Sequence, residues 1–148
     1  MSYSRIKSYA KINLALNITG KTAELHKIES VVCFVTLHDV ILIKKIQSKK
    51  HIISFKGKFS KNIDPKNTIS KLFKFLEKEK LLTSSKFEIK VNKYIPSKSG
   101  LGGGSMNAAN ILKYLIKKNF INPSKSQLSS ICNSVGSDVV LGLNSTFT

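Results

Sequence analysis

The chain has 148 residues with 25 Lys or Arg against eight Asp or Glu, which gives a formal net charge of +17. Hydrophobic residues make up 41% of it, so we expect one globular core rather than a disordered chain. No apolar run reaches the roughly 20 residues of a membrane-spanning helix. The N-terminus carries no apolar secretory segment, and we therefore expect a cytoplasmic protein.

The positive charge leaves two kinds of partner open. All basic residues except Arg5 are lysines, and they are spread through the whole chain. Lysine neutralises phosphates without reading bases, so a polyanionic metabolite such as a nucleotide and a nonspecifically bound RNA are both candidates. Base readout favours arginine, and no aromatic RNA-binding motif is present, so we do not expect a specific nucleic-acid site.

The two cysteines, Cys33 and Cys132, lie in apolar segments. They have no partner at the spacing of a metal site, so we predict two buried, reduced thiols.

Residues 12–18 alternate between apolar and other side chains, which predicts a strand. Lys11 and Asn13 should project together from the face of this strand opposite Leu14, away from the core. Three further strands are predicted at 28–37, 40–46 and 51–55.

A turn at His38 and Asp39 should separate the strand at 28–37 from the strand at 40–46. Because the segments are short and closely spaced, we expect antiparallel pairing.

A helix should follow the loop around Pro65, with Asn67 as its N-cap. Its apolar residues recur at helical spacing. The chain then returns to a strand over 86–95, in which apolar and polar residues alternate. The predicted buried stripe of the helix is Ile69, Leu72, Phe73 and Leu76.

A glycine-rich turn joins this strand to a second helix, over Pro-Ser-Lys-Ser-Gly-Leu-Gly-Gly-Gly-Ser-Met-Asn-Ala-Ala at 96–109. The free N–H groups and the positive dipole end of a helix start attract anions, so the turn predicts a phosphate cradle. A side chain at Gly103 should occupy the space of the phosphate. The hydroxyl of Ser105 could reach a phosphate or its Mg²⁺.

A third helix should start at Ser124, where Ser124 and Gln127 have capping-box spacing, and should stop at Gly136. We expect Asp138 to follow as the chain returns to the sheet. The predicted buried stripe is Leu128, Ile131, Cys132 and Val135.

Three segments together resemble the GHMP small-molecule kinases, and within them the 4-diphosphocytidyl-2-C-methyl-D-erythritol kinase subfamily of the non-mevalonate isoprenoid pathway. These segments are Ser-Tyr-Ala-Lys-Ile-Asn-Leu at 8–14, the glycine-rich run at 100–109, and Gly-Ser-Asp-Val at 136–139. Their order and approximate spacing match, so the likeness extends over essentially the whole chain.

The resemblance implies site residues. Asp138 would accept the proton of the substrate hydroxyl, and Lys11 would stabilise charge on the transferring phosphate. Asn13 and His26 match positions that contact the two ends of a cytidine-diphosphate-linked polyol. ATP would be held by Pro96, Gly100, Leu101, Gly102, Gly103, Gly104, Ser105 and Asn107, with Mg²⁺ at Ser105.

The implied fold is α+β, a mostly antiparallel sheet with helices on one face. We expect residues 1–148 to form a single N-terminal, ATP-binding domain without the C-terminal domain of the family, and therefore to be inactive or weak alone. The family usually carries an aromatic residue where this chain has Leu25, which keeps another GHMP kinase with a different alcohol substrate as an alternative.

Overall fold

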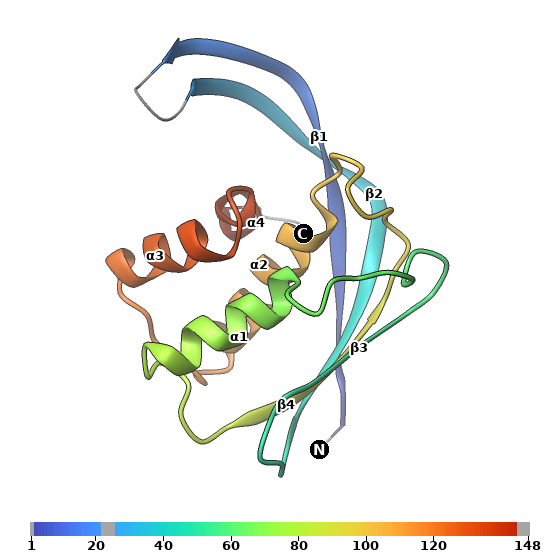
Figure 1. Ribbon diagram of the computed structural model, residues 1–148, viewed down its shortest axis with the longest axis vertical. Helices are drawn as coiled ribbons and strands as arrows, with labels where there is room; N and C mark the ends of the chain where they lie inside the picture. The colour runs from blue at the N-terminus through green and yellow to red at the C-terminus, as the bar shows by residue number, and fades with distance from the viewer. Residues whose placement is uncertain (1, 22–25, 145–148) are drawn as a thin grey trace.

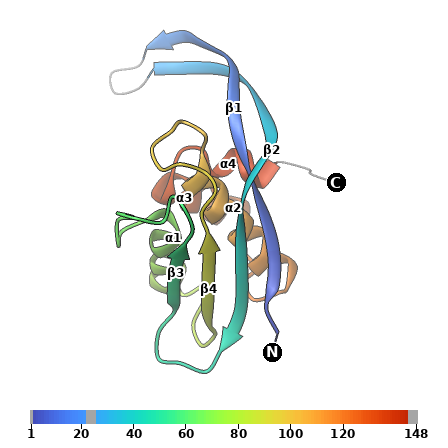
Figure 2. The ribbon, with the colours of Figure 1, turned by 90° about the vertical axis from the view of Figure 1, so that its right-hand side faces the viewer.

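The computed structural model describes residues 2–21 and 26–144, and the side chains of residues 16–19, 21 and 26–30 lie outside this description. In the described part, four strands form one sheet, and the helices pack against one face of it (Figures 1 and 2). This is the α+β arrangement that the sequence predicts. The elements are β1 (Ser4–Lys21), β2 (His26–Ile46), β3 (Ile52–Lys56), α1 (Thr68–Lys78), β4 (Lys86–Asn92), α2 (Gly103–Lys117), α3 (Lys125–Val135) and α4 (Val139–Asn144).

The strands are arranged in the order β1-β2-β4-β3. β1 pairs with β2 and β2 with β4 in antiparallel orientation, whereas β3 runs parallel to β4. β1 and β2 extend well beyond β4 and curve toward the helical side (Figure 1). The parallel pair differs from the antiparallel pairing predicted for the short strands, because α1 carries the chain from β3 back to the start of β4.

The predicted turn at His38 and Asp39 is wrong. β2 continues through both residues, and they pair with Tyr9 and Ser8 of β1. The polar dipeptide suggested a break, but the Asp39 side chain is fully buried and finds hydrogen-bond partners inside the protein. A strand accommodates a buried carboxylate when its oxygens are satisfied in this way.

The strict alternation predicted for β1 is also wrong. Its register against β2 shifts at three places, between Tyr9 and Lys11, between Asn13 and Ala15, and near Gly20. After each shift, the side chains that follow lie on the opposite face of the sheet from the one that strict alternation predicts. As a result Lys11 is buried, with 5% of its surface exposed, whereas Leu14 is 63% exposed.

Both predicted helix caps are confirmed. The Asn67 side chain accepts hydrogen bonds from the backbone N–H groups of Ile69 and Ser70. Ser124 and Gln127 form the reciprocal capping box at the start of α3.

The chain leaves α3 at Gly136, as predicted, but does not return to the sheet. It enters the short helix α4 instead, which packs against α2. Gly136 itself is extended, with φ 171°, and not in the left-handed conformation common at helix ends.

The core lies between the sheet and the helices. Alternate residues of β4 point into it, as the strand pattern predicts. The stripe of α1 is buried as expected, and the first turns of α2 contribute small and aliphatic side chains. The largest fully buried side chains are Phe87, Ile41, Ile43, Ile69, Leu72, Leu76, Ile89, Ile95, Met106, Ile111, Leu112 and Leu115.

The two cysteines are both free, but only Cys132 is buried. Cys33 is exposed on β2, so the prediction of two buried thiols is wrong for this residue. Burial raises the pKa of the Cys132 thiol above its ordinary value. None of the helices within residues 2–21 and 26–144 combines the length and apolar character needed to cross a bilayer.

Candidate active site

The glycine-rich segment lies beside a cavity of about 450 Å³ at the N-terminal ends of α1 and α2. The N-cap Asn67 and Thr68 line it from α1, and Gly103, Gly104 and Ser105 line it from the first turn of α2. Two helix N-termini therefore meet at one cavity, and both favour a negatively charged ligand.

The start of α2 follows from the conformation of the loop before it. Gly102 is the N-cap, with φ 69°, and its carbonyl accepts a hydrogen bond from the backbone N–H of Met106 at 2.8 Å. A positive φ is strained for residues with a side chain, which explains a glycine at this position. No side chain caps this helix start, so its first N–H groups are available to a ligand.

A side chain at Gly103 would not enter the phosphate space as predicted. A Cβ built there would lie 3.0 Å from Cγ2 of Ile95 and 3.3 Å from Nζ of Lys93, on the buried side of the helix. Glycine at this position instead allows α2 to lie close to the segment that leaves β4.

Lys11 of β1 and Asp138, which precedes α4, lie side by side in the structure. Lys11 Nζ is 3.1 Å from Asp138 Oδ2, which confirms the predicted proximity of the two side chains. The lysine side chain is 6% exposed and the aspartate 36%, so the ammonium is held in the protein while the carboxylate remains accessible. Asp138 also lines the cavity at the glycine-rich segment.

Close contacts with the glycine-rich segment hold both members of this pair. The Lys11 backbone N–H donates to the Leu101 carbonyl at 2.9 Å. A Cβ on Gly102 would lie 2.9 Å from Cγ of Lys11, so the absence of a side chain makes room for the lysine stem. Similarly, a Cβ on Gly136 would lie 3.0 Å from Oγ of Ser105.

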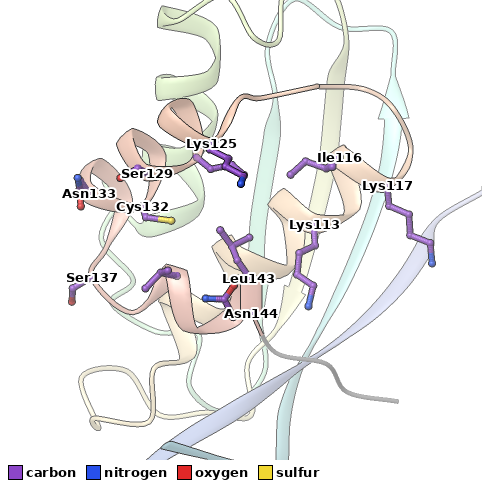
Figure 3. A pocket seen from close by; sticks show the side chains of 12 residues that line it. Lys113, Ile116, Lys117, Lys125, Ser129, Cys132, Asn133, Ser137, Leu143 and Asn144 are labelled. Atoms are coloured by element: carbon purple, nitrogen blue, oxygen red, sulfur yellow. The ribbon is translucent and has the colours of Figure 1, made fainter. Parts of the chain in front are cut away.

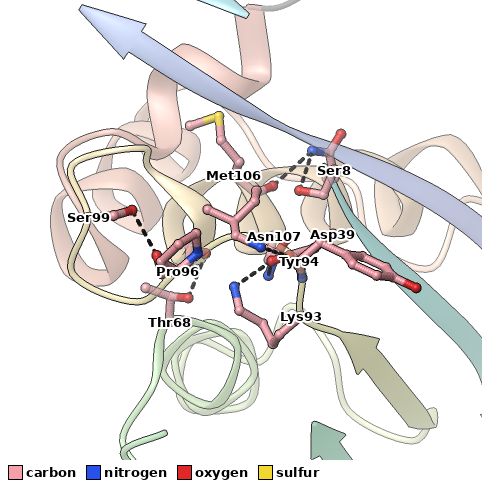
Figure 4. Close-up of polar contacts among 12 residues, drawn as sticks. Ser8, Asp39, Thr68, Lys93, Tyr94, Pro96, Ser99, Met106 and Asn107 are labelled. Atoms are coloured by element: carbon pink, nitrogen blue, oxygen red, sulfur yellow. Dashed lines mark hydrogen bonds and ion pairs between the residues drawn. The ribbon is translucent and has the colours of Figure 1, made fainter. Parts of the chain in front are cut away.

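One hydrogen bond joins the two helix N-termini. Thr68 Oγ1 donates to the Gly104 carbonyl at 2.7 Å (Figure 4). Thr68 lies at the start of α1 and was not predicted as a site residue, because a threonine at the start of a helix is an ordinary feature of sequences.

The basic side chains at the cavity come from several elements. The three exposed lysines place positive charge around the opening, which suits a polyphosphate, whereas Lys93 is buried and paired with Asp39. Apolar side chains of Phe55, Ile63 and Pro96 also line the cavity. Lysines that line the cavity are Lys66, Lys71, Lys93 and Lys98.

A buried polar cluster lies beneath the cavity, around the carboxylate of Asp39 (Figure 4). Asp39 Oδ2 accepts from Lys93 Nζ at 2.5 Å and from Asn107 Nδ2 at 2.9 Å. Asn107, which was predicted to bind the nucleotide, is among the residues that line the cavity, but it is 2% exposed and its amide nitrogen is bonded to Asp39. The only signal for Asp39 in the sequence is an acidic residue within an apolar segment.

Only some of the other predicted residues lie at the cavity. Pro96 and Gly100 line the cavity, whereas Leu101 does not and contributes its carbonyl to Lys11. Asn13 is exposed on β1. The side chain of His26 lies outside the described part of the chain.

A larger cavity of about 740 Å³ lies between α2, α3 and α4 (Figure 3). None of the predicted site residues lines it. Its described lining holds apolar side chains such as Leu128 and Leu143 with lysines at positions 113, 117 and 125, and it contains no acid or histidine. Asp138 and the glycine-rich segment therefore lie at the smaller cavity, not at this one.

Several known proteins are similar to this chain. The GHMP kinases N terminal domain family matches residues 67–147. The 4-diphosphocytidyl-2-C-methyl-D-erythritol kinase of Pelagibacter ubique is 56% identical over 143 residues, which cover 97% of this chain and 51% of that protein. The kinase of the same name from Clostridium beijerinckii is 37% identical over 91% of this chain and 48% of its own length. The chain thus spans about half the length of the curated relatives it matches.

Two solved structures show the same fold. A crystal structure of 4-(cytidine 5'-diphospho)-2C-methyl-D-erythritol kinase aligns with a TM-score of 0.69 at 23% identity, over 95% of this chain and 48% of that one. Mevalonate kinase from methicillin-resistant Staphylococcus aureus aligns with a TM-score of 0.58 at 14% identity, over 96% of this chain and 51% of that one. With a family match over more than half of its residues, the chain belongs to the GHMP kinase family.

Proposed function

We propose that this chain is the N-terminal, ATP-binding domain of a kinase that phosphorylates a hydroxyl of 4-diphosphocytidyl-2-C-methyl-D-erythritol, in the cytoplasm, on the route to isoprenoid precursors. The observation that carries the proposal is the 3.1 Å pair of Lys11 and Asp138 beside a cavity formed by two helix N-termini. The names of the relatives support the choice of acceptor.

The cavity offers separate environments for the two ends of ATP. The N–H groups at the start of α2, with the loop from Gly100 to Gly102, suit the phosphates. Phe55, Ile63 and Pro96, which also line the cavity, supply apolar surface for a flat base.

Asp138 and Lys11 have the properties that the transfer step needs. The acceptor oxygen bonds to the terminal phosphorus as the bond from that phosphorus to the departing ADP oxygen breaks. The hydroxyl proton passes to the Asp138 carboxylate, which is accessible enough to meet a substrate. The Lys11 ammonium balances negative charge on the phosphoryl oxygens.

Magnesium fits this site as a companion of the nucleotide. No group of three or more His, Cys, Asp or Glu side chains that could hold a metal ion occurs in residues 2–21 and 26–144. Mg²⁺ often binds through substrate phosphates and few protein ligands, and Ser105 Oγ is available for this role at the cavity. The ion would neutralise charge on the phosphates.

Asn13 and His26 are the proposed contacts to the acceptor. Asn13 is two positions from Lys11 on β1, and its side chain is exposed. His26 opens β2 and pairs in register with Lys21. Both residues thus belong to the long β1–β2 hairpin, which extends past the glycine-rich segment (Figure 2).

The proposal is tested in two steps. Calorimetry on the 148-residue chain should detect binding of MgATP. Activity should then be measured on a chimera that joins this chain to the remaining half of the Pelagibacter ubique relative, which 56% identity makes practicable.

The chimera should transfer phosphate from ATP to 4-diphosphocytidyl-2-C-methyl-D-erythritol. Mevalonate serves as a control acceptor, because the mevalonate kinase from Staphylococcus aureus has the same fold. A chimera that phosphorylates a control acceptor in preference would move the assignment to another GHMP kinase.

A further inference from the structure

The carboxylate of Asp39 bonds both ends of the glycine-rich segment. At one end, Asp39 Oδ1 accepts from the backbone N–H groups of Tyr94 and Ile95 at 2.8 and 2.9 Å, where the chain leaves β4. At the other end, Oδ2 accepts from the side chain of Asn107 in α2. All of the intervening residues, 96–106, therefore lie between two points fixed to one side chain (Figure 4).

Lys93 completes the cluster with a buried positive charge. It is 4% exposed, and its Nζ lies near the start of α2, 3.3 Å from where a Cβ on Gly103 would be. An ammonium beside the positive end of a helix is unfavourable without a counter-charge. Asp39 supplies that charge.

Stability alone does not account for this arrangement. A buried ion pair is often no more stabilising than apolar residues of the same volume. In addition, Oδ1 of Asn107 is buried and has no hydrogen-bond partner among the protein atoms that the structure describes. An unsatisfied buried oxygen is destabilising, so it offsets part of the stability that the bond from Asn107 to Asp39 contributes.

We propose that Asp39 is a positioning residue that, through Tyr94, Ile95 and Asn107, holds the glycine-rich segment in the geometry that binds polyphosphate. This inference rests on the proposed binding of ATP. Asp39 is fully buried and does not line the cavity, and Asn107 reaches the lining with only 2% of its surface exposed, so Asp39 acts through the N–H groups of the loop and of the first turn of α2.

The test compares Asn107→Leu with Asn110→Leu, the same substitution one turn later in α2. Asn110 bonds Ser8 and the Met106 carbonyl, not Asp39. Asn107→Leu should lower MgATP affinity about tenfold, and the denaturation midpoint of the same sample records the stability lost with the bond to Asp39. Adenosine, which lacks phosphates, should bind both variants and the parent chain equally.

Asn110→Leu should also lower the midpoint, because buried Ser8 loses a partner, but it should leave MgATP affinity unchanged. A second variant, Asp39→Asn with Lys93→Met, removes both charges together and should also bind MgATP more weakly. The proposal is overturned if Asn107→Leu binds MgATP as tightly as the parent chain. It is also overturned if the affinities for MgATP and adenosine fall together.

Hydrogen exchange separates this inference from the proposed function. The amides of Lys11 and Met106 bond the carbonyls of Leu101 and Gly102, so their protection reports the position of the segment without any nucleotide. If the parent chain fails to bind MgATP, the proposed function loses its support. Faster exchange at these two amides in Asn107→Leu, but not in Asn110→Leu, then still supports the positioning role. Unchanged exchange in Asn107→Leu overturns it.

Discussion

Lys11 Nζ and Asp138 Oδ2 lie 3.1 Å apart although β1 and the α3–α4 connection are at opposite ends of the sequence. The pair forms because the Lys11 stem lies over Gly102, where any side chain would collide with it, and because Gly136 allows the connection to lie against Ser105. Two glycines in separate segments thus bring an ammonium and a carboxylate to one cavity.

Loss of either charge should abolish most of the turnover of the chimera. We expect Asp138→Asn and Lys11→Met each to lower kcat/KM about a hundredfold or more, because one removes the proton acceptor and the other the balancing charge. The double variant should be little worse than either single one, since the two groups act together. Glu79→Gln, at the exposed end of α1, is the control and should retain full activity. A less than fivefold effect of Asp138→Asn would rule out the proposed role of this residue.

A matched pair of glycine substitutions isolates the contact with Lys11. Gly100 and Gly102 both have positive φ, 78° and 69°, so Ala at either position should lower the free energy of unfolding by about 1 kcal/mol. A Cβ on Gly100 meets nothing within 4 Å, whereas one on Gly102 meets the Lys11 stem at 2.9 Å.

Turnover of the chimera should therefore fall at least tenfold further in Gly102→Ala than in Gly100→Ala, because only the former displaces the ammonium. Steady-state kinetics and denaturation on the same samples provide the comparison. Equal losses of turnover in the two variants would show that backbone strain alone is responsible.

Stability should decrease on mild acidification because of His51. Its ring contacts Phe73 and Phe87, its Nδ1 accepts from the Phe87 N–H, and its Nε2 lies 3.0 Å from Glu77 Oε1. Burial, with the nearby charge of Lys86, lowers the pKa of His51 below 6.5, against an opposing effect of Glu77.

The unfolded chain therefore binds a proton at higher pH than the folded chain does. The contribution of neutral His51 is complete above pH 6.5, the ordinary pKa, and is lost as the pH falls from there through the lower pKa of His51 in the folded chain. Urea denaturation between about pH 7.5 and 5.5 should show this decrease, and His51→Gln should flatten it while lowering stability at the upper pH. A profile with the same slope in His51→Gln would assign the effect to other groups.

The positive charge should produce only weak, salt-sensitive binding of RNA. The lysines are distributed over all parts of the chain, and neutralising six or more phosphates would make the affinity fall about a thousandfold between 50 and 200 mM salt. Fluorescence anisotropy with oligonucleotides of different sequence should give equal affinities. Sequence-selective, submicromolar binding at the higher salt concentration would instead favour an RNA-binding protein.

Local physics made much of the fold predictable from the sequence. Asn67 and Ser124 start their helices through bonds to residues two or three positions away, and the alternation in β4 depends only on its own pleat. The glycine-rich turn likewise follows from backbone freedom and helix-end electrostatics within one segment. Its likeness to GHMP kinases, with the motifs around Lys11 and Asp138, also indicated which side chains should meet.

Tertiary structure decided the features that depend on partners far along the chain. The register shifts of β1 arise only against β2, and they bury Lys11 and expose Leu14 contrary to the alternation. Asp39 resembled a turn residue because the sequence does not show that Lys93, two backbone amides and Asn107 surround it. A carboxylate can lie inside a strand only when such donors converge on it, and that convergence exists only once β2, β4 and α2 have packed together.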